Sequence, residues 1–395
     1  MRIGLIGILV GCGGLACEDV GADETLEASI DGEADDLDAE VDTQAVVVSH
    51  PGQFATLQQA VDATPDGGVL RLAAGTFHEG ATIAGKSITI VGRGPQRTAL
   101  DGANVATPLV QVGPGGGVIL KKLSLRTDQR AIASALPNGG SATLVRTVEV
   151  TFVDASVAIE GTFDEVGVRR SAIVGAKVAG IALRDTPKSA FRDLTVDCGD
   201  PACLTGLLVD NSALPQATAN LEEVTVNGGS AGGIAVLGGK KLRAETVAVT
   251  SARVFGLGVL GVKSADLSNI YVESTAAKPD GSWGDGIVVW ASKAVLRATA
   301  PYSSASYWNA RAAVSVIGCA DTGQAASLAM SNTILGLSPL TIVGSPTTMG
   351  GEPCSAGSVG FSDGGGVTCL SESYATIACV AQLTHLGPLE APAVP

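Results

Sequence analysis

Aromatic side chains that could bind a sugar are concentrated in one short part of the chain. All three tryptophans and three of the four tyrosines fall between residues 271 and 308. Flat rings stack on the apolar C–H faces of sugars, and a carboxylate beside them can accept hydrogen bonds from sugar hydroxyls. We therefore predict a saccharide-binding patch; the alternative is that these rings bury irregular loops. The candidate residues are Trp283, Asp285, Trp290, Tyr302, Tyr307 and Trp308.

Carboxylates that recur at the spacing of a repeat form a second group of candidates. Glu160, Arg184 and Asp210 fall in one column when the repeats described below are aligned, and Asp185 lies beside that column. Charges that alternate in this way predict a surface ladder, worth a few tenths to ~1 kcal/mol per pair. A calcium site is the alternative, because calcium binds several converging carboxylates. We predict no other metal site and no other cofactor.

A repeated array of short strands must position these residues. The chain is rich in glycine, with 52 of 395 residues, and poor in aromatic residues, which does not favour helices. Two interleaved series of apolar residues recur at steps of 22 to 30 residues. The first is Leu125, Val150, Val174, Val196, Val226, Val249 and Val272, and the second is Val157, Ile181, Leu207, Ile234, Val259 and Ile287.

This periodicity predicts a solenoid in which each repeat contributes at least two strands. Each inward residue would lie above that of the preceding coil, ~4.8 Å away, so that aliphatic side chains fill the interior. A β-sandwich is the alternative fold. It would require hairpin turns of the Asn-Gly type, which are rare in this sequence.

The stretch from Phe54 to Gly102 opens this array. Thr56 can cap a short helix that buries Leu57, Ala60 and Val61, and strands are expected over 69–72, 81–83 and 87–91. The stretch resembles the opening of right-handed parallel β-helix proteins of the pectin lyase-like superfamily, and most closely that of pectinesterases. The matching segments are Thr56-Leu-Gln-Gln-Ala-Val-Asp62, Gly75-Thr-Phe-His-Glu79 and Ile90-Val-Gly-Arg-Gly94. The resemblance implies an all-β fold with an N-terminal capping helix.

The resemblance also provides a test for catalytic residues. Pectinesterases carry a nucleophilic Asp in a GTxDFIFG motif, and Gly161-Thr-Phe-Asp164 matches part of it. Their second Asp, about one coil earlier, has no counterpart, because no Asp or Glu lies between Gln129 and Arg146. A lone carboxylate cannot act as both nucleophile and acid/base group. Asp164 is therefore expected to be a solvated turn residue, and Asp164, Asp185 and Asp210 remain only weak catalytic candidates.

The cysteine pattern predicts disulfides, because the chain carries an export signal and exported proteins form them. We expect Cys198 to pair with Cys203 within one loop. Four cysteines of the C-terminal part allow three pairings, of which we favour Cys319 with Cys354 and Cys369 with Cys379. We expect this part to cap the open end of the solenoid.

The N-terminus has the features of an export signal followed by a tether. Arg2 precedes an apolar run over 3–10 that is too short to span a bilayer. Two cysteines follow bacterial lipobox-like sequences; we favour lipidation of Cys17 over Cys12, because it leaves an even number of cysteines. An ordinary cleaved signal without a lipid is the alternative. Residues 18–42 hold twelve acidic and no basic residues, which predicts a disordered spacer.

The charge of the remaining chain argues against nucleic acid as a partner. Without the twelve acidic residues and Arg2, the chain keeps 27 acidic residues, from 39 − 12, and 24 basic residues, from 25 − 1. A net charge of −3 does not favour binding to anionic polymers through the overall field.

These observations divide the chain into residues 1–17 as signal, 18–45 as tether, 46–312 as β-helix and 313–395 as C-terminal coils with a cysteine-containing cap. We expect an exported, lipid-anchored, monomeric protein at the outer membrane or cell surface that binds saccharide or serves as a scaffold, without identifiable catalytic residues. The alternative is a polysaccharide-active enzyme of the pectin lyase-like superfamily, a lyase, hydrolase or esterase.

Overall fold

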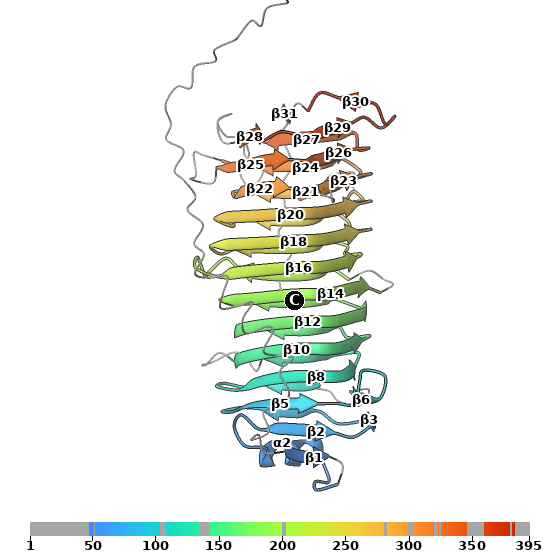
Figure 1. Ribbon diagram of the computed structural model, residues 1–395, viewed down its shortest axis with the longest axis vertical. Coiled ribbons are helices and arrows are strands. Elements are labelled where there is room, and N and C mark those ends of the chain that lie inside the picture. The colour runs from blue at the N-terminus through green and yellow to red at the C-terminus, as the bar shows by residue number, and fades with distance from the viewer. Residues whose placement is uncertain are drawn as a thin grey trace, which may run out of the picture. The chain divides into compact units, whose positions relative to one another are not determined.

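A computed structural model describes residues 47–50, 52–102, 108–134, 142–199, 203–279, 283–298, 304–319, 323, 325–345, 359–379 and 381–383. Residues from 45 onward form one compact unit. Its described strands stack as successive coils of a parallel β-helix (Figure 1). Every described ladder is parallel except that between β29 and β30, which excludes the β-sandwich.

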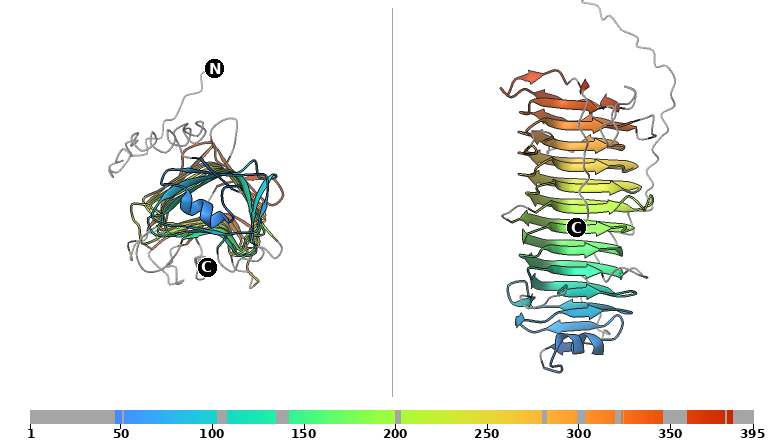
Figure 2. Two further views of the ribbon diagram at one scale, coloured as in Figure 1. Left: turned by 90° about the horizontal axis from the view of Figure 1, so that it is seen from below. Right: turned by 180° about the vertical axis from the view of Figure 1, so that it is seen from behind.

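Each coil has three faces, which are visible as the sides of the outline in Figure 2. Faces 1 and 2 belong to one sheet, because seven long strands bend around the corner between them. These strands are β8 (Gly117–Arg126), β10 (Ala142–Val153), β12 (Phe163–Ala176), β14 (Lys188–Cys198), β16 (Thr218–Asn227), β18 (Lys241–Thr250) and β20 (Ser264–Glu273).

Shorter strands extend these two faces toward both ends of the solenoid. Face 1 also contains β1 (Val47–His50), β2 (Val69–Leu72), β5 (Ser87–Val91), β22 (Lys293–Arg297), β25 (Ala326–Ser331) and β28 (Val359–Asp363). Face 2 also contains β3 (Gly75–Phe77), β6 (Thr98–Asp101), β23 (Ser304–Tyr307), β26 (Thr333–Gly336), β29 (Thr368–Leu370) and β30 (Thr376–Ile377).

Face 3 is a separate sheet of twelve strands. Its members are β4 (Ala81–Ile83), β7 (Val110–Val112), β9 (Arg130–Ser134), β11 (Val157–Gly161), β13 (Ala179–Arg184), β15 (Thr205–Asn211), β17 (Gly232–Gly238), β19 (Phe255–Leu260), β21 (Asp285–Trp290), β24 (Ala312–Ile317), β27 (Leu340–Ser345) and β31 (Ala381–Leu383).

Left-handed residues make the corner between faces 1 and 2. One residue in the middle of each long strand has a positive φ, which turns the chain sharply without ending the ladder. These residues lie at neighbouring positions of successive coils. They are Lys122, Glu149, Arg170, Asp193, Glu223, Thr246 and Asn269.

The predicted files of aliphatic residues are confirmed in the middle of the chain. Val196, Val226, Val249 and Val272 are direct partners in successive parallel ladders, and all four are fully buried. The neighbour of Val196 in the preceding coil is Ile173. On face 3, Ile181, Leu207 and Ile234 are partners in the same way, and Ile287 continues that file through Leu257.

Four assignments within the two series were wrong by one or two residues. Val174 points outward and is 44% exposed, because Ile173 occupies the inward position. Val150 pairs with Leu123, while Leu125 pairs with Phe152. On face 3, Ile159 and Leu257 occupy the positions that we expected for Val157 and Val259. The left-handed corner residues interrupt the period-two alternation on faces 1 and 2, and several positions in each strand are apolar, so spacing alone does not fix the register.

The N-terminal helix α2 (Leu57–Ala63) closes the lower end of the interior, as predicted (Figure 2). Thr56 caps it through a hydrogen bond from the amide of Gln59, at 3.2 Å. The matched motif residue Glu79 accepts a hydrogen bond from the amide of Leu57, which places an acidic group at the positive end of the helix. Lys86 donates to three carbonyls at the other end. The connections between the strands that follow the helix thus bind both of its ends.

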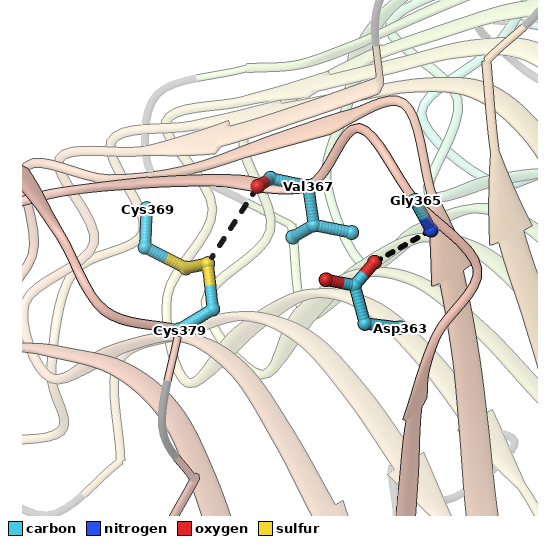
Figure 3. The surroundings of a disulfide bond; sticks show 5 residues. All are labelled: Asp363, Gly365, Val367, Cys369 and Cys379. Carbon is cyan, nitrogen blue, oxygen red and sulfur yellow. Dashed lines mark hydrogen bonds between the residues drawn. A yellow bond between two sulfur atoms is a disulfide. The ribbon is translucent and has the colours of Figure 1, made fainter. Parts of the chain in front are cut away.

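Disulfide bonds join Cys198 to Cys203 and Cys369 to Cys379, the pairings that we expected. The first closes the loop between β14 and β15. The second links β29 to the segment that follows β30, at the C-terminal end of the solenoid (Figure 3).

The remaining predictions for cysteine fall partly beyond the described residues. Cys319 is disulfide-bonded. Its predicted partner Cys354 lies outside the described residues, as do Cys12, Cys17 and the acidic segment 18–42. Lipidation and the tether therefore stay predictions.

Glycines near the start of the face 3 strands allow the two sheets to approach. A Cβ on Gly206 would lie 2.2 Å from Cγ1 of Val226, and the equivalent atom on Gly256 would lie 2.2 Å from Cγ1 of Val272. These glycines therefore set the width of the interior at the valine file.

We predict that Gly206→Ala lowers the free energy of unfolding by roughly 1–3 kcal/mol, because a methyl group would overpack the interior. Gly167→Ala on the outer side of face 1 is the control, since its added Cβ would meet the Cγ of Arg146 at 3.4 Å. Urea unfolding followed by circular dichroism measures both. Equal losses in the two variants would show that the valine contact does not limit the packing.

Candidate functional site

The predicted aromatic patch is divided between the surface and the interior. Trp308 is 47% exposed and Tyr307 is half-buried, whereas Trp283 is only 2% exposed and Asp285 is fully buried. In this structure Trp283 and Asp285 therefore do not face a ligand at the surface, which corrects our expectation for these two residues. Tyr302 lies outside the described residues.

Three aromatic side chains form a continuous group, which we call the aromatic step: Tyr271, Tyr307 and Trp308. The rings of Tyr271 and Tyr307 meet edge to face, with centroids 6.4 Å apart. The rings of Tyr307 and Trp308 are tilted relative to each other, with centroids 5.9 Å apart. Tyr271 comes from β20, and Tyr307 ends β23 in the next coil. Trp308 has a φ of 48°, in the left-handed corner that leads from face 2 to face 3. At this corner its side chain is largely accessible to solvent.

Glu273 adds a carboxylate to the aromatic step. It is the ladder partner of Tyr307 and accepts a hydrogen bond from the hydroxyl of Tyr271. That hydrogen bond, together with burial and the negative charge of Glu273, raises the pKa of Tyr271 to about 12. Burial also raises the pKa of Tyr307. Both phenols therefore stay protonated near neutral pH, and that of Tyr271 donates its hydrogen to Glu273.

A polar ladder on face 2 leads to the aromatic step. Asn227 donates from Nδ2 to Oδ1 of Asp197 at 3.2 Å, and Thr250 donates from Oγ1 to Oδ1 of Asn227 at 3.2 Å. Thr250 is in turn the ladder partner of Glu273. Hydrogen-bonding groups thus lie in one row over four coils, followed by the aromatic rings.

The buried half of the predicted patch is an ion pair. Asp285, at the start of β21, binds the guanidinium of Arg311 through both carboxylate oxygens, with Nε at 2.7 Å from Oδ1. The hydroxyl of Ser315 donates to Oδ2 at 2.7 Å. The guanidinium carbon of Arg311 also lies 4.7 Å from the centroid of the Trp283 ring, within cation–π range. This cluster joins the segment before β21 to the turn before β24.

Two opposing effects act on the acidity of Asp285. Complete burial is the largest and raises the pKa of its carboxyl group. The hydrogen bond and charge of Arg311 lower the pKa, followed by the hydroxyl of Ser315 and the amide of Ala312. The carboxylate therefore has several donors around it and no contact with solvent.

Sequence reasoning missed Arg311 as the partner of Asp285. The signal was present, because Arg311 follows Asp285 by 26 residues, which is one repeat. Residues one repeat apart lie on neighbouring coils, so the two could have been placed together.

Trp290 lies apart from the aromatic step, at the opposite end of the face 3 strands. It ends β21 and is half-buried against a cluster of apolar residues on the outer side of face 3. Its indole Nε1 is buried and has no hydrogen-bond partner among the described residues. The accessible part of the ring is therefore its carbon skeleton.

The carboxylates singled out in the sequence do not gather into one site. Asp164 is exposed at the start of β12, and Asp185 lies in a left-handed turn after β13. Asp210 accepts hydrogen bonds from the amide and the hydroxyl of Ser212. Arg184 and Asp210 are ladder partners as predicted, but Glu160 pairs with Ala182 and lies outside that column.

Glu160 is displaced because the true register of β11 and β13 differs from our alignment by two residues. Its carboxylate lies 3.5 Å from the guanidinium of Arg130. Within the described ranges, no group of three or more His, Cys, Asp or Glu residues could hold a metal ion. Over the same ranges, no helix has the length and apolar character required to cross a membrane.

Comparison with known proteins identifies the fold. No family model and no curated protein matches this sequence. Among solved structures, the periplasmic alginate epimerase AlgG matches 82% of this chain and 83% of its own, with a TM-score of 0.51 and 11% identity. The catalytic unit of a GH87 α-1,3-glucanase from Streptomyces thermodiastaticus matches 82% of this chain and 69% of its own, with a TM-score of 0.44 and 14% identity.

The chain is a parallel β-helix. At these identities the likeness concerns the fold alone, so any function must be argued from the residues of this chain.

We predict that Asp285→Asn lowers the free energy of unfolding by about 3–5 kcal/mol, because it leaves the charge of Arg311 without its buried partner. Asp266→Asn is the matched control, since it breaks an ion pair with Arg297 in which both side chains are at least one-third exposed. In the control, the free energy of unfolding is expected to fall by at most about 1 kcal/mol. Thermal and urea unfolding measure both variants, and equal losses would refute a structural role for the buried pair.

Proposed function

We propose that this protein is an exported polysaccharide-binding β-helix whose binding surface includes the aromatic step. The observation that carries this proposal is the exposed ring of Trp308 beside Tyr307 and Tyr271, with the carboxylate of Glu273 next to them. Rings of this kind bind the C–H faces of sugars, and adjacent polar groups bind the hydroxyls.

The direction of the polar ladder supports an extended ligand. Coils repeat at ~4.8 Å, so a ligand that lies along the solenoid axis meets equivalent backbone positions at each step. The row from Asp197 to Thr250 offers donors and acceptors at three such steps before the aromatic rings. Polymers with a regular repeat suit this surface better than compact small molecules.

The comparison and the disulfides support this proposal at a coarser level. The solved structure with a TM-score of 0.51 is that of an alginate epimerase from the periplasm, and alginate is a polysaccharide. Disulfides such as Cys198–Cys203 are typical of oxidising compartments outside the cytosol. A lipid anchor at Cys17 would hold the solenoid at a membrane and belongs to the same proposal.

We predict that Trp308→Asn weakens polysaccharide binding about tenfold, equal to roughly 1.4 kcal/mol, through loss of the stacking surface. Asparagine tolerates the left-handed backbone at this position, so the corner is expected to keep its shape. Affinity gel electrophoresis against a panel of soluble polysaccharides measures the change.

Tyr374→Asn is the matched control, because Tyr374 is also left-handed and is 65% exposed on the C-terminal hairpin. Its binding should equal that of the unmodified protein. If the protein binds no polysaccharide in the panel, or if both variants bind like the unmodified protein, the aromatic step is not the binding site.

A polysaccharide-active enzyme is the second candidate function. The alginate epimerase AlgG, which has a similar fold, is an enzyme. Within this chain, Asp285 is a carboxyl group whose pKa is raised by burial, held beside Arg311 and Trp283. Carboxyl groups with raised pKa values occur in active sites as well as in structural ion pairs.

If the enzyme proposal is correct, the protein changes a polysaccharide and Asp285 is required for the change. Proton NMR of each polymer after incubation detects cleavage, elimination and epimerisation in one measurement. The double variant Asp285→Leu and Arg311→Met replaces the ion pair by apolar side chains, which a fold often tolerates. Loss of product in this folded variant supports catalysis by the pair, and unchanged product formation excludes it.

A further inference from the structure

A second aromatic surface lies at the corner between face 3 and face 1. The ring of Trp290 packs beside Gly261 of the preceding coil, where a Cβ would lie 3.9 Å from its Cζ3. The amide of Gly261 donates to the carbonyl of Trp290 at 2.8 Å. The buried hydroxyl of Ser292 donates to that same carbonyl at 2.7 Å and accepts from the amide of Val262 at 2.9 Å. This turn therefore holds Trp290 in a fixed position.

Four exposed lysines lie at the same corner as Trp290, in its own coil and in the two coils before it. We call them the lysine edge: Lys240, Lys241, Lys263 and Lys293. They belong to three consecutive coils, since Lys241 is the ladder partner of Ser264 and the amide of Lys263 donates to the carbonyl of Gly239. Neighbouring coils are ~4.8 Å apart, so the lysines form a row parallel to the solenoid axis.

The described residues do not neutralise the charges of the lysine edge. None of the four lysines forms an ion pair with a residue in the described part of the chain. The acidic side chains of the adjoining face 1 strands are Glu222, Glu245 and Asp266, and each of them already pairs with an arginine. The connecting segments 239–240, 261–263 and 291–292 contain no Asp or Glu. Over the described residues, this corner therefore carries a local positive charge.

We propose that Trp290 and the lysine edge bind an acidic polysaccharide that lies along the solenoid axis. The accessible part of the half-buried Trp290 ring offers a stacking surface for one sugar ring. The ammonium groups of successive coils would pair with the carboxylates of successive sugars. That the ligand is a polysaccharide rests on the proposed function. The location of this second binding surface does not depend on the aromatic step, which lies at the opposite ends of the face 3 strands.

Polygalacturonate and its fully methyl-esterified form test this proposal, because they share a backbone and differ in charge. Binding to the full chain is measured at low and at moderate ionic strength by affinity gel electrophoresis. One variant carries Lys241→Gln, Lys263→Gln and Lys293→Gln. The control carries Lys122→Gln, Lys177→Gln and Lys278→Gln, which remove the same charge from other parts of the surface.

We expect polygalacturonate to bind, salt to weaken it, and the lysine-edge variant to bind at least tenfold more weakly, with the control within twofold of the unmodified protein. The methyl ester should bind at least tenfold more weakly than polygalacturonate. Equal weakening in both triple variants, or equal binding of acid and ester, would overturn the proposal.

Two further outcomes separate this proposal from others. If duplex DNA or vesicles of anionic phospholipid bind as tightly as polygalacturonate through the same lysines, the surface is a general polyanion site and the proposal fails. If neutral polysaccharides bind through Trp308 while polygalacturonate does not, this inference fails and the proposed function stands. If no polysaccharide binds, both fail.

Discussion

The structure depends on the direct stacking of successive coils. No single coil encloses a core, so each inward side chain is buried only by its neighbours in the coils above and below. The file through Val196, Val226 and Val249 shows this most clearly, with each valine paired in register with the next. Gly206 and Gly256 face this file from the opposite sheet and leave room for nothing larger than a hydrogen atom. Register, interior width and the direction of every outward side chain follow from this contact.

Surface chemistry in such a fold is organised in columns. An outward position repeats in every coil, so each further coil adds one side chain to a row that can bind a ligand. The ladder from Asp197 to Thr250 is such a row. The late coils depart from this regularity. Polar side chains are buried there beside the aliphatic ones. Asn309 donates from Nδ2 to Ser306, accepts from the amide of Thr275 and donates from its own amide to Ser338. The aromatic residues accompany this irregular part, which explains why they are divided between interior and surface.

The sequence predicts the architecture well because the repeat and the helix signals are local. The capping helix at Leu57–Ala63 and the early strands are confirmed at their predicted positions. Register is less predictable, since Ile173 and Val174 are adjacent apolar residues and only the corner geometry decides which one points inward. Burial of outward residues is the least predictable, because Asp285 and Trp283 are covered by packing on the outer side of face 3. The sequence around each tryptophan does not show that Trp308 is exposed and Trp283 is buried.

The buried ion pair links the two questions of binding and catalysis. Asp285 accepts hydrogen bonds from Arg311, Ser315 and the amide of Ala312, so its lone pairs are already engaged. Proton transfer to a substrate would require at least one of these donors to leave. In the conformation described, Asp285 fixes Arg311, three residues after Trp308, and thereby positions the corner that carries the exposed ring. Catalysis by this group therefore demands a rearrangement around Arg311, whereas binding at the aromatic step uses the surface as it stands.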